Sequence, residues 1–189
     1  MFLVIDTETT GLPRKIPSLL SNKPKWPRMV ALAWIESVKE GEIIAEYHSL
    51  IRPDCYTIPE KATAIHGITT KKAQDEGNQL VSVLETFQKS LERSSFIVGH
   101  NVDFDIQVIA AEAFRSAISI PVNKVPKKCT MKTSARLCGI PRGRGYKYPS
   151  LAELHEKLFE VPPPDPHHAL SDARSCMKCY LELKKRGII

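Results

Sequence analysis

The sequence predicts an α/β domain built on a mixed sheet, and two features of its order along the chain support this. Extended apolar segments come first, at residues 1–7, 29–38 and 42–51. Only three residues, Lys39-Glu40-Gly41, separate the last two segments, so this part should be an antiparallel three-strand meander. Beyond residue 58, helix-like and strand-like segments alternate, which is typical of α/β domains with parallel strands.

The later elements are predicted from the spacing of apolar residues and from residues that typically end helices. Residues 58–69 read I-P-E-K-A-T-A-I-H-G-I-T, which predicts a short helix that ends at Gly67. Residues 80–93 form an amphipathic helix, with apolar side chains at Leu80, Val83, Leu84, Phe87 and Leu91. A fourth strand is expected at residues 95–99, and helices are expected at residues 104–117, 150–159 and 169–184.

Length and composition are those of an ordinary globular protein. With 189 residues, the chain should form a single domain over residues 1–189. Hydrophobic residues make up 42% and charged residues 25%, and no apolar run approaches the roughly 20 residues of a membrane helix. The start M-F-L-V-I-D lacks the basic region and cleavage site of a signal peptide. We therefore expect a cytoplasmic protein with no membrane partner.

The five cysteines are scattered and odd in number, which is not the pattern of a disulfide-rich secreted domain. Cys176 and Cys179 form a C-x-x-C, but they lie in a helix-like run without a second pair at zinc spacing. We expect reduced thiols, with these two in the core rather than in a metal or redox site.

The net charge of +6 is unevenly distributed. Residues 13–35 hold five basic residues, residues 115–149 hold nine, and neither stretch holds an acid. Aromatic residues lie in both, Trp26 in the first and Tyr146 and Tyr148 in the second. Basic loops with aromatic residues suit phosphates and stacked bases, although simple solvated loops are the alternative.

Two carboxylates end the first strand, in V-I-D-T-E-T-T-G-L-P. Side chains two apart on a strand point to the same face, so Asp6 and Glu8 should lie side by side, about 7 Å apart at their Cα atoms. Two anions so close are unfavourable unless a cation lies between them. An isolated D-x-E is otherwise most often a pair of exposed surface acids.

Two more carboxylates are expected near the end of the first strand, on other elements of the chain. Asp105 follows the fourth strand and is expected to face inward, because the apolar pattern of I-Q-V-I-A continues from it. Asp172 lies in the first turns of the last helix, after the pair His167 and His168. Each could be an ordinary acid near a helix start, but four carboxylates together could hold two Mg²⁺ ions about 4 Å apart for phosphodiester hydrolysis.

The phrases D-T-E-T-T-G-L-P, G-H-N-V-D-F-D and H-H-A-L-S-D-A occur in the order and spacing of a known family. They resemble the three exonuclease motifs of the DEDD superfamily, in its His-containing DEDDh (DnaQ-like) branch. The proofreading epsilon subunit of bacterial DNA polymerase III belongs to that branch, and residues 58–69 resemble the segment between its first two motifs. The resemblance covers residues 2–183, nearly the whole chain.

The resemblance implies a ribonuclease H-like fold and a 3′→5′ exonuclease that releases nucleoside 5′-monophosphates from DNA with two Mg²⁺ or Mn²⁺ ions. By motif position, one ion would be held by Asp6, Glu8 and Asp172, and the other by Asp6 and, through water, Asp105. Four residues separate the general base from the last Asp in this branch, which selects His167 over His168. The residues that would border the 3′-terminal nucleotide are Thr10, Gly11, Leu12, His66, Ile68 and Asn101.

Two features depart from the family pattern. Residues 14–28 form a longer, Pro-rich and basic insertion after the first motif, and the last motif lies close to the end of the sequence, so we expect no polymerase-binding or clamp-binding tail. A DNA polymerase subunit remains the candidate partner.

The alternatives are a 3′→5′ exoribonuclease of the same family, a catalytically silent nucleic-acid-binding domain and a phosphatase with Asp6 as nucleophile. A silent domain should have lost a carboxylate, and all four are present. Glu8 and the spacing of His167 from Asp172 disfavour the phosphatase.

Overall fold

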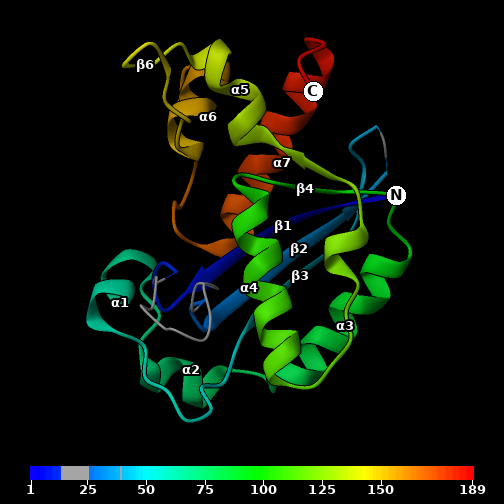
Figure 1. Ribbon diagram of the computed structural model, residues 1–189, viewed down its shortest axis with the longest axis vertical. Coiled ribbons are helices and arrows are strands. Elements are labelled where there is room, and N and C mark those ends of the chain that lie inside the picture. Colours follow the sequence, from blue (N-terminus) through cyan, green and yellow to red (C-terminus); the bar gives the residue numbers. More distant parts are fainter. Residues whose placement is uncertain (14–25, 39) are drawn as a thin grey trace, which may run out of the picture.

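A five-stranded mixed sheet forms the centre of the protein (Figure 1), in the order β3-β2-β1-β4-β5. The computed structural model describes residues 1–13, 26–38 and 40–189, so most of the predicted basic insertion lies outside the described residues. The first three strands form the predicted antiparallel meander, and β4 and β5 run parallel to β1. The bounds are β1 Phe2–Thr9, β2 Met29–Ser37, β3 Ile43–Leu50, β4 Ile97–Gly99 and β5 Lys127–Cys129.

Helices cover both faces of this sheet (Figure 1). In chain order they are α1 Glu60–His66, α2 Thr70–Glu76, α3 Leu80–Glu92, α4 Val102–Arg115, the short 3₁₀ helix η1 Val122–Lys124, α5 Thr130–Cys138, α6 Leu151–Phe159 and α7 Ala169–Lys185. A small hairpin of β6 (Pro141–Arg142) and β7 (Gly145–Tyr146) precedes α6. None of the helices in the described part of the chain is both long and apolar enough to span a membrane.

The alternation of side chains along β1 divides the core in two. Leu3 and Ile5 point into a cluster with α3 and α4, whereas Phe2 and Val4 pack against α7. Both faces of β1 are therefore buried, which explains its unbroken apolar run. Cys176 and Cys179 of α7 are 1% and 0% exposed, which confirms them as core thiols.

The predicted elements are confirmed with small shifts at their ends, but the 3₁₀ helix η1 and four other features were not predicted from the sequence. α5 was missed although Met131, Ala135 and Cys138 recur at helical spacing, and its buried side chains, Thr130 and Ser134, are small and polar. β5 is a three-residue edge strand that begins with two lysines. The other two are α2, whose buried side chain is Ala73, and the β6–β7 hairpin, whose strands have two residues each.

A buried carboxylate ties α4 to the start of β2. Glu112 is 1% exposed, and its Oε1 accepts hydrogen bonds from the Arg28 side chain at 2.8 Å and from the Met29 backbone N–H at 2.9 Å. Arg115 forms a second ion pair with the same carboxylate at 3.1 Å. The Arg28 guanidinium lies 4.2 Å from the centre of the Tyr56 ring. This network fixes the place where the chain returns to the sheet after the first motif.

We expect Glu112→Gln to lower the free energy of unfolding by about 1–3 kcal/mol, because the amide keeps the shape but leaves two arginines without their counter-charge. Chemical denaturation measures this, with Glu85→Gln on the exposed face of α3 as the matched control. Equal, small losses in both variants would show that the Glu112 charge contributes nothing to stability.

Candidate active site

The first motif lies at the carboxyl end of the central strand. Asp6 and Glu8 follow Phe2 and Val4 in the alternation of β1, so they share the face that α7 covers. β4 pairs with β1 at Leu3 and Val4 and then turns into α4, so among the described residues no strand lies beside the second half of β1 on that side. This gap at the sheet leaves room for side chains from other elements beside the two carboxylates.

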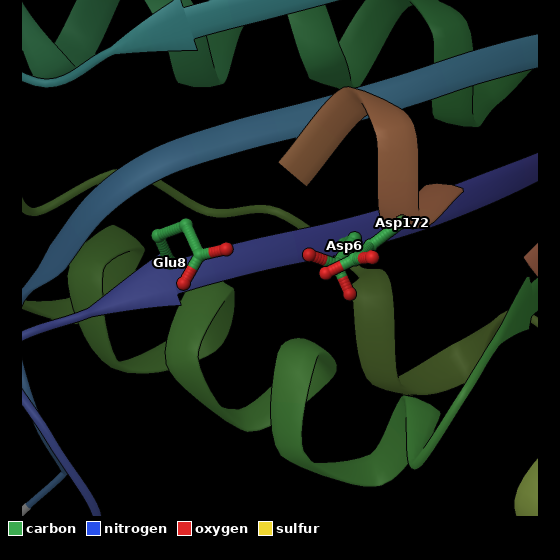
Figure 2. A group of neighbouring side chains, drawn as sticks. All are labelled: Asp6, Glu8 and Asp172. Atoms are coloured by element: carbon green, nitrogen blue, oxygen red, sulfur yellow. The ribbon is translucent and has the colours of Figure 1, made fainter. Parts of the chain in front are cut away.

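The first turn of α7 supplies a third carboxylate. Asp6, Glu8 and Asp172 each offer an oxygen, and the three atoms lie within 4.8 Å of one another. Figure 2 shows Asp6 and Glu8 on the same strand, with Asp172 coming from α7 to meet them. Asp172 Oδ2 accepts a hydrogen bond of 2.9 Å from the His167 backbone N–H, and this bond orients the carboxylate.

Asp105 approaches from the opposite helix layer. It lies in the first turn of α4, is 3% exposed and accepts a hydrogen bond of 2.7 Å from the Thr7 hydroxyl. The inward orientation predicted for Asp105 is therefore confirmed. Its neighbour Asp103 instead points outward and pairs with Lys127 and Lys132. Asp105 is not part of the three-carboxylate group, but it is close enough for its charge to act on Asp6 and Glu8.

Burial and mutual repulsion together oppose ionisation of these groups. Burial raises the pKa of Glu8 to about 8, and the charges of Asp172 and Asp105 add to the effect. The pKa of Asp6 is raised well above its ordinary value by burial and then by its three acidic neighbours. Burial raises the pKa of Asp105 to about 7, although the Thr7 hydroxyl bond opposes the change. Such crowding is typical of a site that holds cations.

The two adjacent histidines have different surroundings. His168 is the residue before α7, and its ring centre lies 4.7 Å from that of His48 on β3. His167 is exposed, has a backbone φ of 66° and donates its N–H to Asp172. A positive φ is unfavourable for a residue with a side chain, so the site holds His167 in a strained conformation.

A cavity of about 380 Å³ opens beside Glu8, and four of the residues predicted to border a nucleotide line it. These four are Thr10, Gly11, Leu12 and His66. The turn that carries the first three is fixed, because Thr10 exchanges hydrogen bonds of 2.9 and 3.0 Å with the backbone of Arg28. The predicted residues therefore form one wall of a pocket next to the carboxylates.

The other two predicted nucleotide-bordering residues lie elsewhere. Ile68 is 7% exposed and belongs to a buried cluster, although it lines a neighbouring cavity of about 230 Å³ that also contacts His66 and His167. Asn101 is exposed at the start of α4 with φ 71° and does not line the 380 Å³ cavity. A larger cavity, of about 800 Å³, lies between α7 and β3 and contacts none of the four carboxylates.

The sequence alone did not identify Lys61, Ile65 and Phe104 as lining residues of the 380 Å³ cavity. Lys61 and Ile65 are one helical turn apart on α1, and the exposed apolar side chain of Ile65 was the available signal. Trp26, in contrast, was expected to offer a stacking surface, but it is partly buried and packs edge-to-face on Phe104 at 6.0 Å.

Comparison with known proteins identifies the family. The RNase T exonuclease family model matches residues 3–180, which is most of the chain. The chain belongs to this exonuclease family. The match includes all four carboxylates and both histidines that precede α7.

Two curated relatives of this exonuclease-family chain resemble it at similar identity. The 3′-5′ exonuclease DinG of Bacillus subtilis (strain 168) is 27% identical over 187 residues, which are 98% of this chain but 18% of DinG. The DNA polymerase III subunit epsilon of Treponema pallidum (strain Nichols) is 27% identical over 179 residues, which are 95% of this chain and 74% of that subunit. This chain thus spans less than a fifth of DinG.

Solved structures confirm the predicted ribonuclease H-like architecture. The zinc-bound complex of Escherichia coli ExoI with single-stranded DNA matches with a TM-score of 0.76 at 20% identity, over 98% of this chain and 40% of the ExoI chain. Exonuclease X in complex with 5′-overhanging duplex DNA matches with a TM-score of 0.62 at 27% identity, over 99% of this chain and 93% of that chain.

The raised pKa values predict a pH-dependent stability of the metal-free protein. Glu8 and Asp105 hold protons in the folded state that the unfolded chain releases, from about pH 4 up to about pH 8. The folded state binds more protons in this range, so these groups destabilise it increasingly as the pH rises. Asp6→Asn removes one of the repelling charges, and its gain in Tm over the wild type should therefore grow from pH 5 to pH 8.5.

Thermal unfolding in EDTA at several pH values measures this gain. The difference should reach several degrees at pH 8.5, because about 1 kcal/mol shifts the Tm of a protein of this size by roughly 2–4 °C. Asp75→Asn, at an exposed ion pair on α2, is the control and should show no such trend. A constant difference across the pH range would mean that folding does not raise the pKa of Asp6.

Proposed function

We propose that this chain is a divalent-metal-dependent exonuclease that removes nucleotides one at a time from the 3′ end of DNA. The observation that carries this proposal is the convergence of Asp6, Glu8 and Asp172, with oxygens within 4.8 Å, beside a cavity of about 380 Å³. The family match, a relative named as a 3′-5′ exonuclease and neighbours solved with DNA support it.

The donor set fits Mg²⁺ or Mn²⁺. All of the ligands are carboxylate oxygens, which hard cations prefer, and no histidine or cysteine belongs to the group found among the described residues. Asp6, Glu8 and Asp172 would hold one ion, and Asp6 and Asp105 would hold a second, Asp105 through water. Bound cations would supply charge neutralisation at the scissile phosphate and a lower pKa for the attacking water.

The residues of the 380 Å³ cavity would hold the terminal nucleotide. The turn of Thr10 and Gly11 forms one wall, and the α1 side chains form the facing wall. His66 Nδ1 accepts a hydrogen bond of 3.1 Å from the Ile68 backbone N–H, so the proton of the neutral ring lies on Nε2. That Nε2 atom is buried, and a hydrogen-bonding interaction of the ring with the Thr9 backbone opposes the lowering of the His66 pKa by burial.

We assign the general base to His167. Its backbone is bonded to Asp172, so its imidazole is attached directly beside the carboxylate group, whereas the ring of His168 is occupied by its contact with His48. His167 is also exposed, which leaves its ring free to accept a proton from a water molecule and release it to solvent.

The relatives also indicate a partner. Similarity to a DNA polymerase III epsilon subunit makes a DNA polymerase the candidate assembly in which this chain would act. Copurification with polymerase subunits would test this association separately from catalysis.

The test of the proposed function is a digestion of 5′-labelled substrates. With Mg²⁺, we expect single-stranded DNA and a duplex with a mismatched 3′ end to shorten stepwise from the 3′ end, and RNA of the same sequence to shorten more slowly. EDTA should stop the reaction, and Asp6→Ala should abolish it while the protein stays folded. Internal cuts, faster loss of RNA or full activity in Asp6→Ala would contradict the proposal.

The two histidines give a second prediction. His167→Ala should lower kcat by roughly 10²–10⁴-fold, the usual contribution of a general base. His168→Ala should cost clearly less, because that ring packs on His48, whereas the His167 backbone is bonded to Asp172. Rates at saturating DNA and metal measure both effects, and a larger loss in the His168 variant would assign the base to His168.

A further inference from the structure

The β6–β7 hairpin presents cations and aromatic rings that the proposed catalytic site does not use. Arg142 and Arg144 are exposed, and Tyr146 and Tyr148 are 54% and 55% exposed. Neither arginine has an ion-pair partner among the described residues. The nearest acids in the sequence are Glu112 and Glu153, so the whole stretch between them is free of negative charge. We refer to residues 140–149 as the cationic hairpin.

Two lysines that precede the cationic hairpin in the sequence pair with an acid on the helix that carries Asp105. Asp103 lies on α4 two residues before Asp105, and it pairs with Lys127 and Lys132. Its carboxylate raises the pKa of Lys132, and the nearby Tyr148 hydroxyl contributes a smaller effect in the same direction. One carboxylate balances two lysines, so a net positive charge remains beside the start of α4.

His100 directly follows β4 and connects the base of the cationic hairpin to the end of that strand. Its Nε2 donates a hydrogen bond of 3.0 Å to the Pro149 carbonyl, and its Nδ1 lies 3.0 Å from the Thr130 hydroxyl at the start of α5. A carbonyl can only accept, so Nδ1 of the neutral ring accepts from Thr130. Burial lowers the pKa of His100 to about 4, so this clamp keeps its form at neutral pH.

The rest of the hairpin is held at its base and open at its tip. Lys147 donates its backbone N–H to Ile140 at 2.9 Å, and its ammonium pairs with Glu153 at 2.6 Å. Ser150 and Glu153 form a capping box that begins α6 directly after the hairpin. The two arginines therefore stand on a backbone that is fixed at its base before any ligand binds.

We propose that the cationic hairpin is a second nucleic-acid contact site, which holds the substrate strand beyond the nucleotide in the active-site cavity. This inference rests on the proposed exonuclease function. A strand whose end lies at the carboxylates must continue along the protein surface, and its phosphates are attracted to unpaired arginines while its bases can stack on exposed tyrosines. An acidic protein partner would use the same charges but would have no need of the connection to the catalytic site.

The test compares a substrate that fills only the active site with one that reaches the hairpin. The p-nitrophenyl ester of thymidine 5′-monophosphate represents the first, and a single-stranded DNA of 20 nucleotides represents the second. In the double variant Arg142→Ala/Arg144→Ala, hydrolysis of the ester should stay within about twofold of the wild type, because neither arginine belongs to the catalytic machinery. The KM for the long DNA should rise at least several-fold, with kcat little changed.

Salt dependence identifies the contacts as phosphate contacts. For single strands, each lost phosphate contact lowers the log-log slope by roughly 0.7, so the double variant should lose up to about 1.4. Arg52→Ala/Lys89→Ala removes the same charge from exposed positions outside residues 115–149 and is the matched control. Tyr146→Ser/Tyr148→Ser should raise the KM for long DNA without changing the slope, because stacking does not release counterions.

Several results would overturn the inference. An unchanged KM and salt slope for long DNA, or an equal effect of the control pair, would assign the hairpin to solubility or to a protein partner. Failure of the proposed function can be distinguished from failure of the hairpin inference, because the wild type would then hydrolyse neither substrate. In that case, equilibrium binding of labelled DNA of 3 and 20 nucleotides still tests the hairpin, since only the longer strand should lose affinity in the arginine variant.

Discussion

The burial of four carboxylates close together, where burial and repulsion both oppose their charge, is the constraint on which the rest of this structure depends. Asp6 and Glu8 can stay close to Asp172 only because β1 is fixed from both faces by the core and from both edges by β2 and β4. The Thr7 hydroxyl and the His167 N–H each donate to one of these acids, which orients it without supplying positive charge. The fold therefore holds an arrangement that is unfavourable without cations, as expected where a site is built for them.

The fold could be predicted wherever burial is apolar and periodic. The apolar run of β1 and the helical spacing from Leu80 to Leu91 both appear as predicted. Prediction failed where the buried side is polar, as in α5, or where a strand is too short to show a pattern, as in β5. Such segments depend on tertiary contacts, such as those of Thr130 with Gly99 and His100, that a single sequence does not reveal.

The carboxylates of the site were more predictable than the groups around them. Spacing alone places Asp6 and Glu8 on one face, and the apolar pattern after Asp105 separates it from the outward-facing Asp103. The surroundings of the two histidines could not be predicted in this way. They depend on a positive φ at position 167 and on the contact of His168 with a distant strand. No local pattern encodes either feature, so only the motif spacing of the family could favour one histidine over the other.

The separation of the basic residues from the acidic site follows from the same constraint. A site made of four acids repels a polyanionic substrate until cations are bound, so attraction must come from groups placed outside it. Placed within the site, lysines or arginines would pair with the carboxylates and compete with the cations, as Lys127 and Lys132 do with Asp103. Basic residues therefore serve best on the surrounding surface, close enough to act across the roughly 8–10 Å over which charges are felt at physiological salt. Residues 115–149 contain nine basic residues and no acid, and two of them, Lys127 and Lys132, pair with Asp103, two residues before Asp105.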